Sequence, residues 1–214
     1  MLFRHLKTKA AFACLAVAMT FAALPTRADP VVDQPAPTFV GKTADGQTLD
    51  LKSLQGKTVV LEWTNHECPF VKKHYDKSGN IPKLQKETVA QGIVWLQVIS
   101  SAPGKQGYVD GATAIKVNAD RGAAPTNTIL DPEGKIGKLY GAQTSPHLFI
   151  INPAGVLVYK GGIDSIPSSD PADIAKAENY VRVALADLAA GKKIAQSSTK
   201  DRKSTRLNSS HLVI

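Results

Sequence analysis

The chain has 214 residues, of which 43% are hydrophobic and 21% are charged, and its formal net charge is +8. This composition is typical of a folded globular protein and excludes a disordered chain. Two cysteines are too few for a disulfide scaffold or a cysteine-only zinc module. The basic excess alone would suggest a nucleic acid or a membrane surface as partner, so the positions of the charges matter.

The first 28 residues have the organisation of a secretory signal peptide. Basic residues between Arg4 and Lys9 precede an apolar run from Ala10 to Leu24, and small residues precede the expected cleavage site before Asp29. The run is shorter than the roughly 20 residues of a membrane-spanning helix, which makes an uncleaved anchor the weaker interpretation. We therefore expect a periplasmic or secreted protein with no stable membrane anchor after cleavage.

Residues 201–214 resemble the translation of a common sequencing adapter. The match covers the eleven residues from Asp201 to His211 and is therefore highly specific, the alternative being a natural Ser- and Arg-rich tail. We predict that this segment is an artefact, which independent sequencing of the locus would test. Between the two ends, residues 29–200 contain 19 basic and 17 acidic residues, a net charge of +2. Without a basic patch, nucleic acid is not an expected partner.

The predicted elements begin with an extended, proline-bounded segment over residues 31–37. The β-branched, apolar run 58–63 predicts a buried strand. A helix is expected over 68–75, with proline in its first turn, and a second helix over 81–90. Because 93–99 is another buried strand, the order of these elements predicts a parallel βαβ unit with a right-handed crossover.

The second half of the chain alternates weaker helical and strand signals. A loop is expected over 101–107, followed by a weak helix over 112–119 and a short strand over 128–130. Two apolar runs flank Asn152–Gly155, whose proline and glycine positions predict a β-hairpin with a type I turn. A capped, periodic segment predicts one last helix from Pro171 to Gly191. The expected fold class is therefore α/β, with a central mixed β-sheet and helices on both faces.

Cys68 is the candidate functional residue. If cleavage removes Cys14, it is the single thiol of a protein in an oxidising compartment. Its position at a predicted helix start favours the thiolate, the nucleophilic form, because unpaired N–H groups point toward it. His66 and Lys72 would also favour the thiolate, whereas Glu67 would oppose it. A buried, inert cysteine is the alternative, but the polar run before Cys68 indicates a surface position.

The segment from Glu62 to Lys73 resembles the active-site segment of the thioredoxin-like superfamily and, more narrowly, that of secreted redoxins of the AhpC/TSA type. The segment from Tyr140 to Ile151 is similar to the proline-loop strand of the same family. The resemblance spans about residues 33–190 and implies a thioredoxin-like redoxin domain, which we place at 29–196.

This resemblance implies a thiol-dependent oxidoreductase with Cys68 as the redox nucleophile and no cofactor. Its substrate would be a protein or small-molecule disulfide, or a peroxide, and a separate thiol would supply electrons. Pro146 would shape the substrate groove through a cis Ser145–Pro146 bond that faces the cysteine. The residues expected to support this pair are Trp63, Asn65, His66, Pro69, Ser145 and His147.

The segment also departs from the family's pattern. Val71 stands where thioredoxins have a second cysteine, so no Cys-x-x-Cys disulfide can form in this motif. Asn65 stands where typical peroxiredoxins have Thr or Ser, three residues before the cysteine. Leu61 stands where they have Pro, seven residues before it. Family members continue past a Ser-Thr-Lys segment such as 198–200 into a tail with another cysteine, a candidate resolving thiol. Disulfide exchange and peroxide reduction therefore both stay open.

A non-catalytic thioredoxin-fold module that binds a partner or handles copper is the alternative function. His66, Cys68, His74 and His147 could in principle surround a metal, but cysteine and histidine without paired spacing are a weak signal, and no metal is expected. His74 and Lys73 are expected on a solvated helix face. His147 could assist proton transfer or simply pack at the start of a strand.

Overall fold

The computed structural model describes residues 29–199, so the predicted signal peptide (1–28) and the predicted adapter-derived segment (201–214) lie outside the described residues. The strands are β1 (Val40–Thr43), β2 (Thr48–Asp50), β3 (Val59–Trp63), β4 (Val94–Ile99), β5 (Asn127–Leu130), β6 (His147–Ile151) and β7 (Leu157–Gly161). The helices are α1 (Pro69–His74), α2 (Asn80–Ala90), α3 (Gly111–Asp120), α4 (Lys135–Tyr140) and α5 (Tyr180–Ala189), with short 3-10 helices η1 (Leu51–Leu54) and η2 (Pro171–Asp173).

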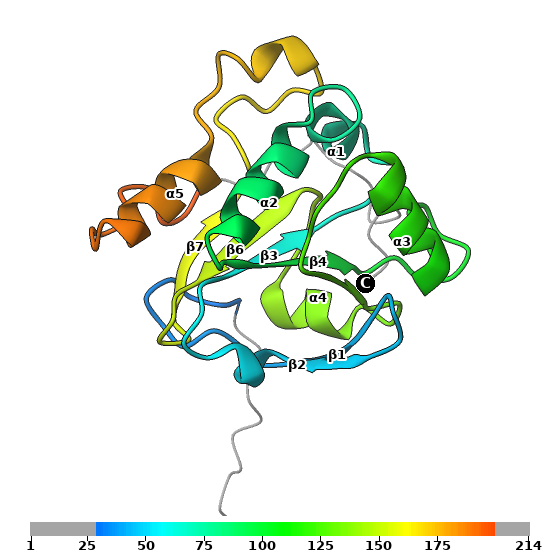
Figure 1. Cartoon of the computed structure of the whole chain (residues 1–214), viewed down its shortest axis with the longest axis horizontal. Coiled ribbons are helices and arrows are strands. Elements are labelled where there is room, and N and C mark those ends of the chain that lie inside the picture. The colour runs from blue at the N-terminus through cyan, green and yellow to red at the C-terminus, as the bar shows by residue number, and fades with distance from the viewer. Residues whose placement is uncertain (1–28, 200–214) are drawn as a thin grey trace, which may run out of the picture.

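The seven strands form one mixed sheet in the order β2-β1-β5-β4-β3-β6-β7 (Figure 1). Strands β3, β4 and β5 are parallel, and β6 is antiparallel to β3. Every residue of β3 and β4 is buried, as expected for central strands that are covered on both faces and read as continuous apolar runs. Since α1 and α2 connect β3 to β4, the predicted βαβ unit is confirmed.

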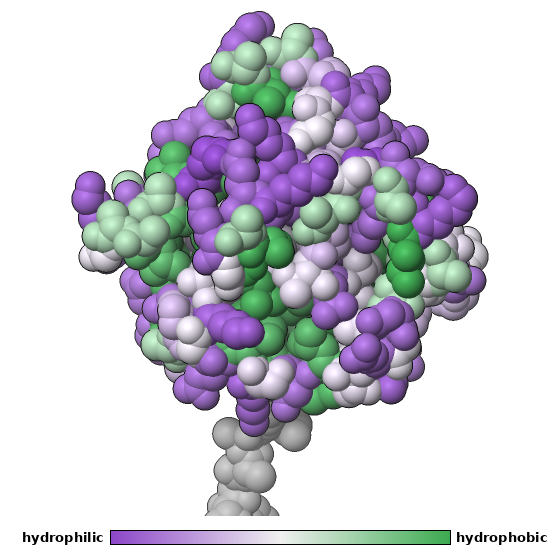
Figure 2. Space-filling view, viewed as in Figure 1, coloured by the Kyte–Doolittle hydropathy of each residue, from purple (hydrophilic) through white to green (hydrophobic). Residues whose placement is uncertain are grey.

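The sheet separates two apolar clusters. On one face, α1, α2 and α5 pack over a cluster that includes Val60, Trp95 and Leu148. On the other face, α4 packs through Ile136 and Tyr140 over a cluster that includes β3 and β6 side chains. Helices thus cover both faces, and the predicted α/β, thioredoxin-like architecture is confirmed. The face in Figure 2 is mostly hydrophilic, with apolar side chains gathered in smaller areas between polar ones.

The predicted hairpin after β6 is also confirmed. Strands β6 and β7 are antiparallel, and the N–H of Gly155 donates to the carbonyl of Asn152 at 2.9 Å. The Asn152 side chain accepts the N–H groups of Ala154 and Val156 at 3.0 Å each. Asparagine at the first turn position stabilises the turn because its short side chain reaches backbone groups two to four residues ahead.

The last predicted helix is wrong in its extent. The chain forms only the 3-10 turn η2 and then, after a gap, α5. The cause is tertiary: the N–H of Ser165 donates to the carbonyl of Glu178, and the N–H of Tyr180 to that of Ile163. This pairing holds the backbone extended at Asn179, whose side chain then caps α5 by accepting the N–H of Arg182 at 2.9 Å.

The sequence prediction also missed four short elements. These are the hairpin strands β1 and β2, the 3-10 helix η1 and the six-residue helix α4. Each is too short to repeat its hydrophobic period more than about once or twice, so pattern alone gives little signal. Within residues 29–199, no helix combines the length and apolarity needed to cross a membrane.

Candidate active site around Cys68

Cys68 lies where the chain passes from β3 into α1, beside the carboxyl ends of the central strands. It is the residue before the helix, has extended backbone angles (φ −66°, ψ 127°), and precedes Pro69 at the first helical position. Its N–H donates to the carbonyl of Asn65 at 3.0 Å, and its own carbonyl accepts the N–H of Lys72 at 2.9 Å. The half-buried thiol is not in a disulfide and is the one cysteine within residues 29–199.

The loop before β6 meets this thiol from across the site. The Ser145–Pro146 peptide bond is cis, and Pro146 is buried while Ser145 is half-buried. The Cys68 thiol donates to the carbonyl oxygen of Ser145, with Sγ and O 3.3 Å apart. Two segments that are 77 residues apart in sequence therefore come together at the cysteine, as the sequence resemblance implied for Cys68 and Pro146.

Asn65 and Glu67 connect the cysteine loop to the loop 101–107. The Asn65 side chain accepts the N–H of Glu67 at 2.9 Å and donates to the carbonyl of Gln106 at 3.4 Å. The Glu67 carboxylate accepts the N–H of Gly107 at 2.5 Å. Gly107 has φ +79°, and a Cβ there would lie 2.3 Å from Asn65 Oδ1. A side chain at residue 107 would therefore adopt an unfavourable φ and displace the Asn65 amide. The Glu67 carboxylate has a backbone partner that the sequence did not reveal.

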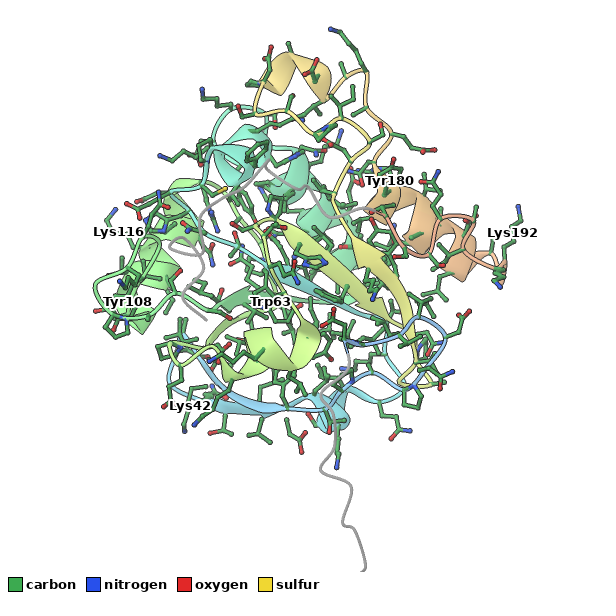
Figure 3. The ribbon with its side chains drawn as sticks, turned by 180° about the vertical axis from the view of Figure 1, so that it is seen from behind. Lys42, Trp63, Tyr108, Lys116, Tyr180 and Lys192 are labelled. Atoms are coloured by element: carbon green, nitrogen blue, oxygen red, sulfur yellow. The ribbon has the colours of Figure 1, made fainter. Side chains whose placement is uncertain are left out.

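Two predicted supporting residues, Trp63 and His147, belong to the opposite face of the sheet. Trp63 packs against Tyr140 and Phe149, with ring centroids 5.3 and 5.2 Å apart, and Figure 3 shows it inside the fold beside α4. His147 stacks on Phe149 with centroids 4.4 Å apart. Cys68 packs against the cluster on the other face. The structure therefore does not bring the His147 ring together with the thiol, and proton transfer between them has no geometric support.

A cleft of about 500 Å³ runs beside the cysteine along α1 and α3, with His66, Lys72, Tyr75 and Arg121 among its lining residues. Burial, the largest cause, lowers the pKa of His66 below its ordinary value of 6.5, although Glu67 acts in the opposite direction. The imidazole is therefore mainly uncharged at neutral pH. Lys72 and Arg121 are therefore the positively charged side chains that line this cleft. The expectation that a charged His66 favours the Cys68 thiolate is not supported, because burial favours the neutral imidazole.

A fully buried carboxyl, Glu62, lies beneath α1 at the centre of a polar network that the sequence prediction missed. It accepts hydrogen bonds from Tyr75 (2.6 Å), Trp95 (2.7 Å) and Gln85 (3.0 Å). Burial raises the pKa of Glu62 and raises that of Tyr75 well above its ordinary value. Arg121 stacks over the Tyr75 ring at 3.8 Å. The one feature of the sequence that could have indicated this network is the charged Glu62 within an apolar strand. A buried carboxylate is energetically unfavourable unless it is hydrogen-bonded.

Lys73 and His74 correct the expectation of a solvated helix face, because both side chains are fully buried. Lys73 Nζ lies 3.2 Å from Asp164 Oδ2 and donates to the carbonyl of Ile166 at 3.2 Å. His74 Nε2 lies 3.4 Å from the same carboxylate oxygen, and its Nδ1 lies 2.9 Å from the Asn80 amide. The segment after β7 supplies these partners and so fixes the helix that follows Cys68.

The histidines considered as metal ligands lie in different environments. His74 is buried beside Asp164, His147 is in the aromatic cluster across the sheet, and His66 is in the cleft beside α1. In the described part of the chain, no group of three or more His, Cys, Asp or Glu residues is placed to hold a metal ion.

The mixed sheet with helices on both faces, and a half-exposed cysteine that meets the loop of a cis-proline, define a protein of the thioredoxin-like class. A family model described as "AhpC/TSA family" matches residues 32–160. The chain therefore belongs to the AhpC/TSA family. No curated protein sequence matches it.

Solved structures share this fold at low sequence identity. An uncharacterized conserved protein from Geobacillus kaustophilus is 21% identical with a TM-score of 0.64, covering 80% of this chain and 87% of that one. A hypothetical protein from Sinorhizobium meliloti is 20% identical with a TM-score of 0.61, covering 81% and 91%. A structure from Chlorobium tepidum, described as a candidate thiol:disulfide interchange protein DsbE, is 21% identical with a TM-score of 0.50, covering 62% and 85%.

Proposed function

We propose that the protein is an exported thiol-disulfide oxidoreductase in which Cys68 is the redox nucleophile. The observation that carries this proposal is the position of the thiol, half-exposed and 3.3 Å from the carbonyl of Ser145 next to Pro146. An inert structural cysteine would more commonly be buried in the core. Export is proposed from the N-terminal sequence pattern, and family membership supports a redox role.

The proposed reaction is thiol-disulfide exchange. The Cys68 thiolate attacks one sulfur of a disulfide, a mixed disulfide forms, and the other sulfur leaves as a thiolate. Val71 stands at the position of a second motif cysteine, so the thiol that resolves the mixed disulfide has to come from outside this motif. The name of the Chlorobium tepidum protein is consistent with this proposed chemistry.

Peroxide reduction is the second candidate, favoured by the family that the chain belongs to. The thiolate would attack one peroxide oxygen, the O–O bond would break, and water or an alcohol would leave. The resulting sulfenic acid would then condense with a second thiol to a disulfide, with loss of water. Asn65 stands where typical peroxiredoxins have a hydroxyl, and its amide already bonds Glu67 and Gln106. Because Asn65 lacks that hydroxyl and its amide is already hydrogen-bonded, it is poorly suited to assist a peroxide, and disulfide exchange is the stronger proposal.

The decisive experiment compares Cys68→Ser with the wild-type residue at 68, both in a full chain that also carries Cys14→Ser, so that the thiol of the predicted signal peptide contributes to neither measurement. The reaction with glutathione disulfide and the stoichiometric loss of hydrogen peroxide are measured per chain. We expect Cys68→Ser to abolish both reactions. Unchanged activity in Cys68→Ser would eliminate the proposal. A wild-type thiol that does not react with glutathione disulfide would instead favour a non-catalytic binding module.

A further inference from the structure

The turn that carries Cys68 lies between β3 and α1 and has a defined shape of its own. The N–H of Cys68 donates to the carbonyl of Asn65 at 3.0 Å, and the N–H of Glu67 donates to the Asn65 side chain at 2.9 Å. The N–H of Thr64 donates to the carbonyl of Val98 at 3.1 Å and so ties the start of the turn to β4, while α1 holds its end. The middle of the turn needs an attachment of its own, because neither the strand nor the helix includes it.

Asn65 and Glu67 attach the middle of the turn to a single peptide group, the one between Gln106 and Gly107. The Asn65 amide donates to the oxygen of this peptide group at 3.4 Å, and the Glu67 carboxylate accepts its N–H at 2.5 Å. The bond is trans, and the carbonyl and N–H of a trans peptide group point in opposite directions. The peptide group is therefore held from both sides by two side chains of the turn that carries Cys68.

The bond between Gly107 and Glu67 is the stronger of the two. Its acceptor is ionised, and charge-assisted hydrogen bonds are shorter and roughly twice as strong as neutral ones. Gly107 is buried whereas Glu67 is exposed, so loss of the carboxylate would leave a buried N–H without its acceptor. Glu67 is thus bound to the backbone of another loop and is not an ordinary solvated glutamate.

The position of this turn matters for the exchange reaction because the thiol already faces one wall of the site. Sγ of Cys68 lies 3.3 Å from the carbonyl oxygen of Ser145, beside the cis Pro146. A disulfide is attacked on one sulfur, along the axis of the bond that breaks, and this loop restricts the directions from which it can approach. A small alkylating agent can approach from any open side. A misplaced turn should therefore slow disulfide exchange more than alkylation.

We propose that Glu67 is a positioning residue for thiol-disulfide exchange at Cys68. The proposal rests on the proposed function, because it concerns the same nucleophile. Glu67 acts through the N–H of Gly107, which fixes the turn and with it the direction of Sγ. In the exchange, the Cys68 thiolate attacks one sulfur, the S–S bond breaks as the Sγ–S bond forms, and the other sulfur leaves with the bonding electron pair. Glu67 takes up neither a proton nor an electron in this step.

The test measures two rates on the same thiol, in a full chain that also carries Cys14→Ser. Formation of a mixed disulfide with 2-hydroxyethyl disulfide and alkylation by iodoacetamide are both followed by intact mass spectrometry at one pH. Both reagents are uncharged, so a change of charge at residue 67 does not alter their attraction to the site. Both reactions consume the thiolate, so the ratio of the two rates cancels any change in the thiolate fraction.

Four variants separate the hydrogen bond from the charge. Glu67→Leu has no acceptor for the N–H of Gly107, whereas Glu67→Gln keeps an oxygen acceptor and loses the charge. Asn65→Asp removes the donor to Gln106 and so tests the other side of the same peptide group. Glu178→Leu is the matched control, because Glu178 is an exposed glutamate on the segment before α5.

We expect the ratio of disulfide exchange to alkylation to fall about three- to tenfold in Glu67→Leu, because loss of one hydrogen bond lowers the population of the productive turn. Asn65→Asp should lower the ratio in the same direction, and Glu67→Gln and Glu178→Leu should keep the wild-type ratio. A wild-type ratio in Glu67→Leu, or an equal fall in Glu67→Gln, would overturn the positioning role. If Glu67→Leu does not fold, a wild-type ratio in Asn65→Asp would overturn it. A wild-type Cys68 that alkylates but forms no mixed disulfide would contradict the proposed function, and the positioning role with it.

Discussion

Replacing Lys73 by methionine should strongly destabilise the protein, although the neighbouring Lys72 is an ordinary exposed lysine. The Lys73 and Asp164 side chains are 0% and 2% exposed and 3.2 Å apart. Lys73→Met removes the lysine cation from the buried Asp164 carboxylate and leaves the His74 ring, 3.4 Å away, beside it. Removing one partner of a buried ion pair costs about 3–5 kcal/mol, which is a large fraction of the roughly 5–15 kcal/mol that stabilises a typical protein.

Urea unfolding of the full chain at pH 8, followed by tryptophan fluorescence, would measure this loss. In thermal unfolding, the same loss of about 3–5 kcal/mol corresponds to an expected fall in Tm of roughly 6–20 °C for a protein of this size. Lys72→Met, one position away, should change the free energy of unfolding by less than about 0.5 kcal/mol. The double variant Lys73→Met/Asp164→Leu should recover most of the stability, because apolar groups can replace a buried pair without leaving a charge. A loss below about 1 kcal/mol in Lys73→Met would refute the assignment of a buried ion pair.

Two further variants test the surroundings of the cysteine. Burial raises the pKa of Glu62 above its ordinary value of 4.5, so the folded state binds the proton more tightly, and the contribution of Glu62 to stability falls as pH rises above about 4.5. Glu62→Gln should remove this slope in urea unfolding measured from pH 4.5 to 8, and an identical slope in both proteins would count against a buried carboxyl. Gly107→Ala should lower the Tm more than Gly104→Ala: both glycines have positive φ, but a Cβ meets Asn65 at residue 107 and open space at residue 104. The clash should add about 1–3 kcal/mol, and equal losses would show that Asn65 moves aside freely.

The central strands and the site segment were predictable because their signals are local. Residues 59–63 and 94–99 are buried on both faces of the sheet and are therefore apolar except for Glu62 and Gln97. The turn at Asn152–Gly155 depends on residues within the turn itself. Cys68 was found for the same reason, since the start of a helix with proline at its first position is visible in sequence.

Contacts between distant segments explain where the predictions failed. The periodicity after Pro171 fits one helix, but pairing of residues 163–165 with 178–180 breaks it. Lys73 and His74 follow the pattern of a solvated face, yet Asp164 pairs with both in the interior. His147 is close to Pro146 in sequence but on the opposite face from Cys68, because successive side chains of a strand point to opposite faces.

The sequence by itself determined the fold class, the family resemblance and the single candidate nucleophile, because these depend on hydrophobic pattern, local turn chemistry and one motif. It also indicated that the net charge of +8 comes mostly from the two ends of the chain. Only the tertiary structure decided which polar residues are buried, which face of the sheet each of them occupies, and which loops meet at Cys68. Such pairs as Cys68 with Ser145 and Lys73 with Asp164 are separated by 77 and 91 residues, and their partners are set by the packing of the whole sheet.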